Sequence, residues 1–227
     1  MLKVDLVIQF DSKAKFMKYV DLYNSKYRVN TEDKRLYIKL IDQFRQTRKY
    51  KNLFKDDSYI DLAYRTLEAW NMNQRGTRLA SIQSFTNSII KNTDQLSNLS
   101  KYRLENLKQK EFTHVFSELW SLFNNIEVMA TKARIVGLSK TLHFLLPDLV
   151  MPIDRRNILL WLYQTDRYSK EPKREFSDFK EILLAYARLS KHLQLSINDV
   201  DNVGWNKSIP KLIDNAIIGN LLEITSK

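Results

Sequence analysis

The chain has 227 residues, 44% of them hydrophobic, which is enough to bury a substantial core in one domain or two small ones. It contains no cysteine, so disulfides, thiolate zinc sites, cysteine-held iron–sulfur clusters and cysteine nucleophiles are excluded. No apolar run approaches the roughly 20 residues of a membrane-spanning helix, and the N-terminal residues lack the features of a signal peptide. We therefore expect a soluble cytoplasmic protein that has no membrane partner.

The charge balance favours an anionic partner. Lys and Arg number 37 against 26 Asp and Glu, which gives a formal net charge of +11. Eight of the bases lie in residues 34–55, where Asp42 is the single acid. This local excess predicts contacts between nucleic acid and Arg45, Arg48 and Lys49. The alternative is that the charge serves only the solubility of a lysine-rich protein.

The scarcity of helix breakers predicts an all-α fold. Only four glycines and four prolines occur in the chain. Apolar residues recur at the three- and four-residue spacing of a helical face through much of the N-terminal half. This spacing predicts helices over residues 12–26, 31–50, 58–70 and 77–91. Residues 1–10 instead alternate apolar and polar side chains, which indicates a short strand.

A polar stretch, residues 92–100, predicts a loop where a boundary between two helical subdomains would fall. After it, the apolar positions predict a long helix over residues 111–132, with a broad apolar face suited to the centre of a bundle. Further helices are expected over residues 176–193 and from Ser208 onward, where serine can cap a helix and Pro210 is tolerated in its first turn. The sequence thus predicts a single compact multi-helix domain, with two helical subdomains as the alternative.

Residues 134–163 concentrate the residue types that constrain the backbone. The segment reads RIVGLSKTLHFLLPDLVMPIDRRNILLWLY and holds one of the four glycines and two of the four prolines. Gly137 predicts a tight turn, because glycine permits a positive φ or a close approach of the backbone. Ser139 then caps a short helix over residues 140–146.

The second half of this segment predicts a rigid connection to another helix. Pro147 ends the short helix, and Pro152 keeps the residues before it extended, since the residue before a proline avoids the helical region. Asp154 follows and opens a helix that runs to Tyr163. The predicted order is helix, glycine turn, helix, connector and acid-capped helix.

These residues resemble the helix-hairpin-helix element and following aspartate of the helix-hairpin-helix DNA glycosylase superfamily. The matching pieces are Val136-Gly137, Lys140, Pro152-Ile153 and Asp154. In that family the hairpin amides hold a phosphate, the aspartate assists departure of the base, and the lysine, in members that have it, attacks the sugar as a Schiff-base nucleophile. The resemblance implies that Lys140 is the nucleophile and that Asp154 is the acid/base or electrostatic group.

The chain departs from the family pattern at two points. The family hairpin has two glycines separated by one residue, whereas this chain offers only Gly137. The interval from Lys140 to Asp154 is also several residues shorter than in the family. The resemblance covers residues 134–163 and leaves the rest of the chain without a counterpart.

The same segment supplies further expected contacts with nucleic acid. Arg155 and Arg156 lie at a helix N-terminus, where their charge opposes the helix dipole and a bound phosphate would relieve that cost. Around the hairpin, the expected contacts are Arg134, Gly137 and Ser139. No metal-ligand spacing and no cofactor fingerprint occurs in the sequence, so no metal or cofactor is expected.

Each candidate residue also has an ordinary structural interpretation. Asp154 makes a good N-cap without any catalytic role. Lys140 in a first helical turn is usually a solvated surface lysine, since a catalytic lysine needs burial or a charged neighbour. His143, between two apolar residues, is typical of a hydrogen-bonded, partly buried histidine.

Two functions therefore fit the sequence. One is a DNA-processing enzyme of the glycosylase/lyase type, acting on damaged or abasic DNA in DNA repair. The other is a non-catalytic helical module that binds nucleic acid or a protein partner. We expect nucleic-acid binding, and catalysis is an open extension of it. Burial of Lys140 close to Asp154 would favour the enzyme.

Overall fold

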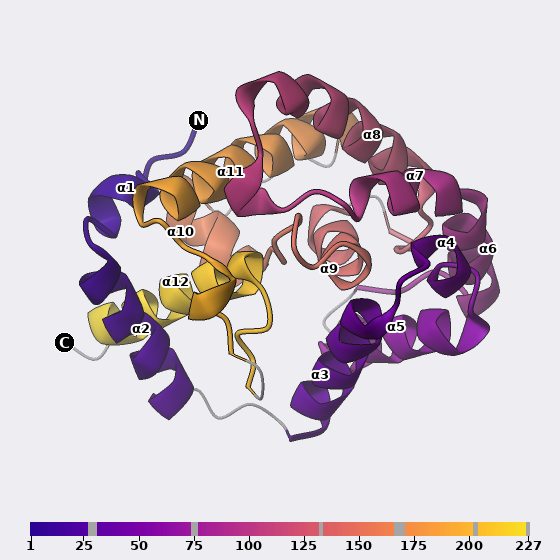
Figure 1. Ribbon diagram of the computed structural model, residues 1–227, viewed down its shortest axis with the longest axis horizontal. Coiled ribbons are helices and arrows are strands. Elements are labelled where there is room, and N and C mark those ends of the chain that lie inside the picture. Colours follow the sequence, from indigo (N-terminus) through magenta and orange to yellow (C-terminus); the bar gives the residue numbers. More distant parts are fainter. Residues whose placement is uncertain (27–30, 74–76, 132–133, 166–170, 202–203, 226–227) are drawn as a thin grey trace.

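The described part of the chain is built from helices (Figure 1). The computed structural model of the protein describes residues 1–26, 31–73, 77–131, 134–165, 171–201 and 204–225. The first helices are α1 (Leu6–Gln9), α2 (Lys13–Lys26), α3 (Thr31–Gln46), α4 (Tyr50–Leu53), α5 (Asp57–Ala69), α6 (Ile82–Lys91) and α7 (Thr93–Leu99). The later ones are η1 (Leu104–Asn106), η2 (Gln109–Glu111), α8 (Phe112–Asn125), α9 (Ile135–Leu145), η3 (Arg155–Leu159), α10 (Leu160–Tyr163), α11 (Pro172–His192), η4 (Ile197–Asp199) and α12 (Ile209–Thr225).

The predicted all-α class is confirmed. The described residues contain no strand, and their β-structure is a single isolated bridge between Leu79 and Met129. None of the described helices is both long and apolar enough to cross a membrane.

Residues 1–10 do not form the predicted strand. The carboxylate of Asp5 accepts the N–H of Val7 at 2.9 Å and thereby caps the short helix α1. Before it, the amide of Lys3 donates to the carbonyl oxygen of Leu162 at 2.7 Å. The prediction was wrong because a good N-cap residue starts a helical turn within the alternating pattern.

The amphipathic helices lie where the apolar spacing predicts them, with shifted ends. The predictions for residues 12–26, 58–70, 111–132 and 176–193 correspond to α2, α5, α8 and α11. The predicted helix over residues 77–91 begins only at Ile82. Its first residues instead pair with the chain after α8: the amide of Ala80 donates to the carbonyl of Val128 at 2.8 Å, and the amide of Ala130 to that of Arg78 at 2.9 Å.

Two other predictions need correction. The predicted helix over residues 31–50 divides into α3 and α4. The polar stretch of residues 92–100 forms α7 instead of a loop, because Leu96 and Leu99 are buried in the core. The subdomain boundary expected there stays a prediction.

Helix α9 lies near the centre of the molecule, with α8 and α11 on one side and α3 and α5 on the other (Figure 1). Ten of its residues are buried, including the polar residues Ser139, Lys140, Thr141 and His143. Burial of a polar group without a partner costs free energy, so the partners of these side chains decide what the centre of the fold can do.

Helix α12 joins the two ends of the chain by packing against α2 (Figure 1). A Cβ atom at Gly219 would collide with the carbonyl group of Tyr19. It would lie only 2.8 Å from the carbonyl carbon of that residue. Glycine is required there because the two helix backbones approach so closely. One turn further along α12, Glu223 accepts hydrogen bonds from Lys18 at 2.8 Å and Tyr19 at 2.9 Å.

Candidate functional site

The predicted glycine hairpin is absent. Gly137 lies inside α9, which begins at Ile135, and the amide of Leu138 donates to the carbonyl oxygen of Arg134 at 2.8 Å. A Cβ atom at position 137 would lie 2.5 Å from the Met129 sulfur. Gly137 therefore serves close packing against the chain that precedes α9, and its amide belongs to the helix instead of a phosphate-binding turn.

The start of α9 is fixed by a residue from another helix. The carboxylate of Glu175, in α11, accepts the N–H groups of Arg134 at 2.9 Å and Ile135 at 3.2 Å. Burial raises the pKa of this carboxyl, whereas the two backbone hydrogen bonds lower it. Helix N-termini leave N–H groups unsatisfied, and here a distant acid satisfies two of them. The predicted start of this helix, after Ser139, was wrong because the residue that caps it comes from far along the sequence.

Ser139 does not cap a helix either. Its hydroxyl lies inside α9, donates to the carbonyl oxygen of Val136 at 3.0 Å and accepts the N–H of Ile153 at 3.0 Å. This second bond ties the extended chain before Asp154 to α9. Ser139 thus holds the connector beside Lys140, and it is fully buried.

Asp154 opens a helix as predicted. One of its carboxylate oxygens, Oδ1, accepts the N–H groups of both Arg156 and Asn157 at 2.9 Å. The turn that it caps, η3, is π-helical and continues into α10. Because both amides bond to Oδ1, the cap uses only one of the two carboxylate oxygens.

Lys140 is buried, so the interpretation as a solvated surface lysine is wrong. The residue is 8% exposed, and its ammonium group lies 3.7 Å from the sulfur of Met72 and 5.6 Å from the centroid of the Trp70 ring. Burial lowers the pKa of Lys140. The charges of Asp154 and Asp214 act in the opposite direction. The structure thus brings Lys140 and Asp154 into one electrostatic environment.

A second buried lysine, Lys211, lies over the same indole ring as Lys140. Lys211 and Asp214, one turn apart on α12, form an ion pair of 2.6 Å, and each is 4% exposed. The Lys211 ammonium group lies 5.2 Å from the centroid of Trp70 and 5.4 Å from that of Trp205. Burial raises the pKa of the Asp214 carboxyl, while Lys211 lowers it. We call the set of Trp70, Lys140, Asp154, Trp205, Lys211 and Asp214 the lysine–tryptophan cluster.

Aromatic side chains continue the wall of this cluster. The ring of Tyr37 stacks on Trp205 at a centroid distance of 5.3 Å and on His143 at 5.7 Å. The Nδ1 atom of His143 lies 2.7 Å from the carbonyl oxygen of Val150, which can only accept, so Nδ1 carries the proton. Burial lowers the pKa of His143 to about 3. The neutral ring then accepts the Tyr37 hydroxyl at Nε2, over 3.0 Å. His143 is therefore a hydrogen-bonded core histidine.

The other residues expected at nucleic acid lie outside the cluster. Arg45 is half-buried, pairs with Asp148 at 3.4 Å and donates to the backbone carbonyl of Lys207. Arg134 is half-buried, with its guanidinium 5.7 Å from the centroid of the Phe123 ring. Arg48 and Lys49 are exposed beyond the C-terminal end of α3, and Arg155 and Arg156 are exposed at the start of η3.

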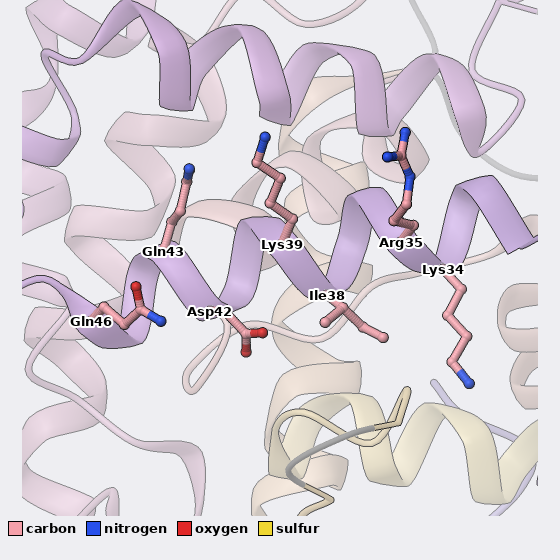
Figure 2. Close-up of a pocket in the computed structure, with 7 residues that line it drawn as sticks. All are labelled: Lys34, Arg35, Ile38, Lys39, Asp42, Gln43 and Gln46. Carbon is pink, nitrogen blue, oxygen red and sulfur yellow. The ribbon is translucent and has the colours of Figure 1, made fainter.

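A surface hollow of about 580 Å³ lies on α3 (Figure 2). Its lining residues all belong to that helix: Lys34, Arg35, Ile38, Lys39, Asp42, Gln43 and Gln46. Figure 2 shows their side chains spreading to both sides of the helix. Asp42 pairs with the buried amine of Lys207 at 2.9 Å. The hollow carries part of the predicted positive charge, but it shares no residue with the lysine–tryptophan cluster.

Four members of the cluster were not predicted as site residues: Trp70, Trp205, Lys211 and Asp214. A signal for two of them exists in the sequence, because Lys211 and Asp214 are separated by three positions within a mostly apolar helix. The tryptophans gave no signal beyond that of packing residues. Among the described residues, no three His, Asp or Glu side chains are grouped as a metal site requires.

The resemblance to the helix-hairpin-helix DNA glycosylase superfamily thus keeps a buried Lys140 on which the charge of Asp154 acts, and it loses the glycine hairpin. It rests on sequence residues alone. Comparisons of the chain with protein-family models, with curated proteins and with solved structures give no match.

Proposed function

We propose that the protein binds DNA and that Lys140 attacks the sugar of a damaged or abasic nucleotide, in a reaction of the glycosylase/lyase type. The observation that carries the proposal is the burial of the Lys140 amine beside Trp70 in the same environment as Asp154. Burial lowers the pKa of this amine, so a larger fraction of it is neutral at a given pH. A neutral amine is the form that attacks a carbonyl carbon.

The proposed reaction at an abasic site proceeds through an imine. The neutral amine of Lys140 adds to the aldehyde carbon of the ring-opened sugar and forms a carbinolamine, which loses water to give an iminium ion. The iminium withdraws electrons from the neighbouring carbon. That carbon, C2′, then loses a proton and forms a double bond to C3′, while the bond from C3′ to the 3′ phosphate oxygen breaks and the phosphate leaves with the electron pair.

Two observations support a role for Asp154 in this chemistry. Its cap uses Oδ1, and the second carboxylate oxygen remains for the iminium charge or for the proton that the sugar loses. Its negative charge acts on Lys140, which supports an electrostatic role. The indole rings of Trp70 and Trp205 provide flat apolar surfaces of the kind on which an extruded base stacks.

Access to Lys140 requires movement of the groups that cover it. Met72 and Trp70, whose side chains lie against the amine, follow α5, so this cover comes from a connecting segment. Connecting segments generally open at a lower free-energy cost than core helices. DNA binding in this proposal exposes the amine by displacing this segment.

The decisive experiment traps the imine. Wild-type protein is incubated with a duplex that contains one abasic site and is reduced with sodium borohydride, and the covalent adduct is located by peptide mass spectrometry. We expect an adduct at Lys140 that is lost in Lys140→Gln and retained in Lys39→Ala, a variant of an exposed lysine on α3. An absent adduct, or one carried by surface lysines alone, would refute the reaction.

A second candidate is a helical module that binds nucleic acid or a protein without catalysis. The observation that favours it is the cover over Lys140, which leaves the residue only 8% exposed. Such a module would bind intact and abasic duplexes equally and give no adduct. Binding to DNA that weakens steeply with salt would identify nucleic acid as the partner of this module. Absence of DNA binding would favour a protein as its partner.

A further inference from the structure

Two of the buried lysines, Lys140 and Lys211, face the same indole ring. The ammonium groups of Lys140 and Lys211 lie 5.6 Å and 5.2 Å from the centroid of Trp70. Asp214 is buried with them, and the charges of Lys211 and Lys140 lower the pKa of its carboxyl whereas that of Asp154 raises it. The charges of two amines and two carboxyls therefore interact here, and three of these four groups, those of Lys140, Lys211 and Asp214, are buried.

The two amines differ in their nearest partners. Among the described residues, Lys211 has a carboxylate at 2.6 Å, whereas none lies within the 4.0 Å ion-pair distance of the Lys140 amine. Lys140 instead donates to the thioether of Met72 and lies over an indole ring. A thioether is a weak acceptor, so Lys140 receives little compensation for the loss of water.

We propose that Lys211 is a positioning residue: it holds Asp214 in an ion pair, keeps that carboxylate from Lys140, and so leaves the Lys140 amine reactive. The consequence for catalysis rests on the proposed function, but the competition between the two lysines does not. A buried amine that gains a carboxylate partner stays protonated and loses its nucleophilicity.

The other titratable groups around Asp214 do not disturb this arrangement. Tyr37 on α3 and Tyr186 on α11 face it, and burial raises the pKa of both phenols well above the ordinary value, so both stay neutral. On α9, burial lowers the pKa of His143 to about 3, which leaves its ring neutral as well. Asp154, at the start of η3, is the second anion. The balance therefore depends on Lys140, Lys211, Asp154 and Asp214.

The test measures the titration of Lys140 in the intact protein, without any DNA. Lysines are labelled with ¹³C at Cε, the NMR shift of each is followed with pH, and the Lys140 signal is assigned from its loss in Lys140→Arg. In Lys211→Gln, Asp214 loses its cation and turns to Lys140. We expect the titration midpoint of Lys140 to rise by about one pH unit or more.

Two further variants serve as controls. Lys211→Arg keeps the cation and should leave the midpoint near that of the wild type. In the double variant Lys211→Gln/Asp214→Asn, the carboxylate is gone as well, so the rise should disappear. An unchanged or lower midpoint in Lys211→Gln, or a rise that persists in the double variant, would overturn the proposal. If Lys211→Gln does not fold, the Lys140 midpoint is measured in the double variant and in Asp214→Asn. A Lys140 midpoint above the wild-type value in either variant overturns the proposal. A midpoint at or below the wild-type value supports the proposal.

Borohydride trapping separates this inference from the proposed function. If Lys211→Gln moves the Lys140 midpoint as expected while the wild type forms no adduct with abasic DNA, the charge competition stands and the reaction fails. If the wild type forms the adduct but the midpoint does not move, the reaction stands and the role of Lys211 fails. If both hold, the adduct of Lys211→Gln should form only at higher pH than that of the wild type.

Discussion

Lys140 lies in the middle of a helix whose residues are buried on nearly every side. Its ammonium group is shielded from water and has a thioether and an indole as its neighbours. Unpaired charge is rare in protein interiors because the loss of water costs about 5 kcal/mol for each ion. Buried charges of this kind cluster at functional sites.

Replacement of this lysine by an apolar residue should stabilise the fold. We expect Lys140→Met to raise the free energy of unfolding near neutral pH by about 1–4 kcal/mol, because the substitution keeps the volume and removes the buried charge. The folded-state pKa of Lys140 lies below its ordinary value of 10.5, so the wild type gains stability as pH rises through the window between the two values. Urea unfolding at several pH values should show that the difference in free energy of unfolding between Lys140→Met and the wild type becomes smaller toward alkaline pH. A destabilised variant would contradict this account.

His143 and Tyr37 give a second prediction at the residue scale. Loss of the hydroxyl in Tyr37→Phe leaves the buried Nε2 of His143 without its donor, and we expect a cost of about 1–3 kcal/mol in urea unfolding. Because the folded-state pKa of His143 is about 3 and its ordinary value is 6.5, the unfolded chain binds the proton first. The contribution of the neutral ring is complete above pH 6.5 and is lost as pH falls toward 3. Equal stability of the variant and the wild type would refute the bond.

At the scale of elements, the sequence predicts the helices that have one apolar and one polar face. It misplaces the start of α9, which is buried on nearly every side. α2, α5, α8 and α11 show the helical period because one side of each meets solvent. α9 is buried nearly all around, so its apolar residues do not mark its start, and Glu175 caps it from 41 positions away. Asp154 is predictable because its cap contacts lie within three residues.

The approach of Lys140 and Lys211 to one indole ring could not be predicted from the sequence. Lys140 and Lys211 belong to different helices, and only the packing of the fold places both over Trp70. The resemblance to the glycosylase pattern selects Lys140 and Asp154 but does not extend to α12. The i,i+3 spacing of Lys211 and Asp214 in a mostly apolar helix is the one local signal for this second pair.

Two glycines allow the packing of the helices to be tested. We expect Gly219→Ala to destabilise the protein by about 1–3 kcal/mol, since the new methyl group meets the backbone of Tyr19 and forces α2 from α12. Gly137→Ala should change stability by less than about 1 kcal/mol, because the flexible side chain of Met129 can move and alanine favours the helix. Thermal unfolding of the two variants compares them directly. A larger destabilisation at Gly137 would indicate the turn that the sequence suggested.

For the whole molecule, the formal charge of +11 is distributed unevenly between interior and surface. Arg45, Lys207 and Lys211 each pair with an aspartate in buried or half-buried surroundings, so they serve the fold. Exposed bases remain on α3 and at the start of η3. Of these two surfaces, the start of η3 is the one joined directly to Asp154 and hence to the lysine–tryptophan cluster.

This placement predicts which bases bind DNA. If DNA reaches Lys140 past η3, the double variant Arg155→Ala/Arg156→Ala should weaken binding and reduce the slope of log affinity against log salt concentration by about 2, because each arginine that neutralises a phosphate adds about 1 to that slope. Fluorescence anisotropy with a short duplex between about 50 and 200 mM salt measures this slope. The matched control is Lys108→Ala/Lys110→Ala, which removes the same charge from exposed lysines at η2. Equal weakening in the two double variants would mean that net charge alone attracts DNA, and the route past η3 would then be wrong.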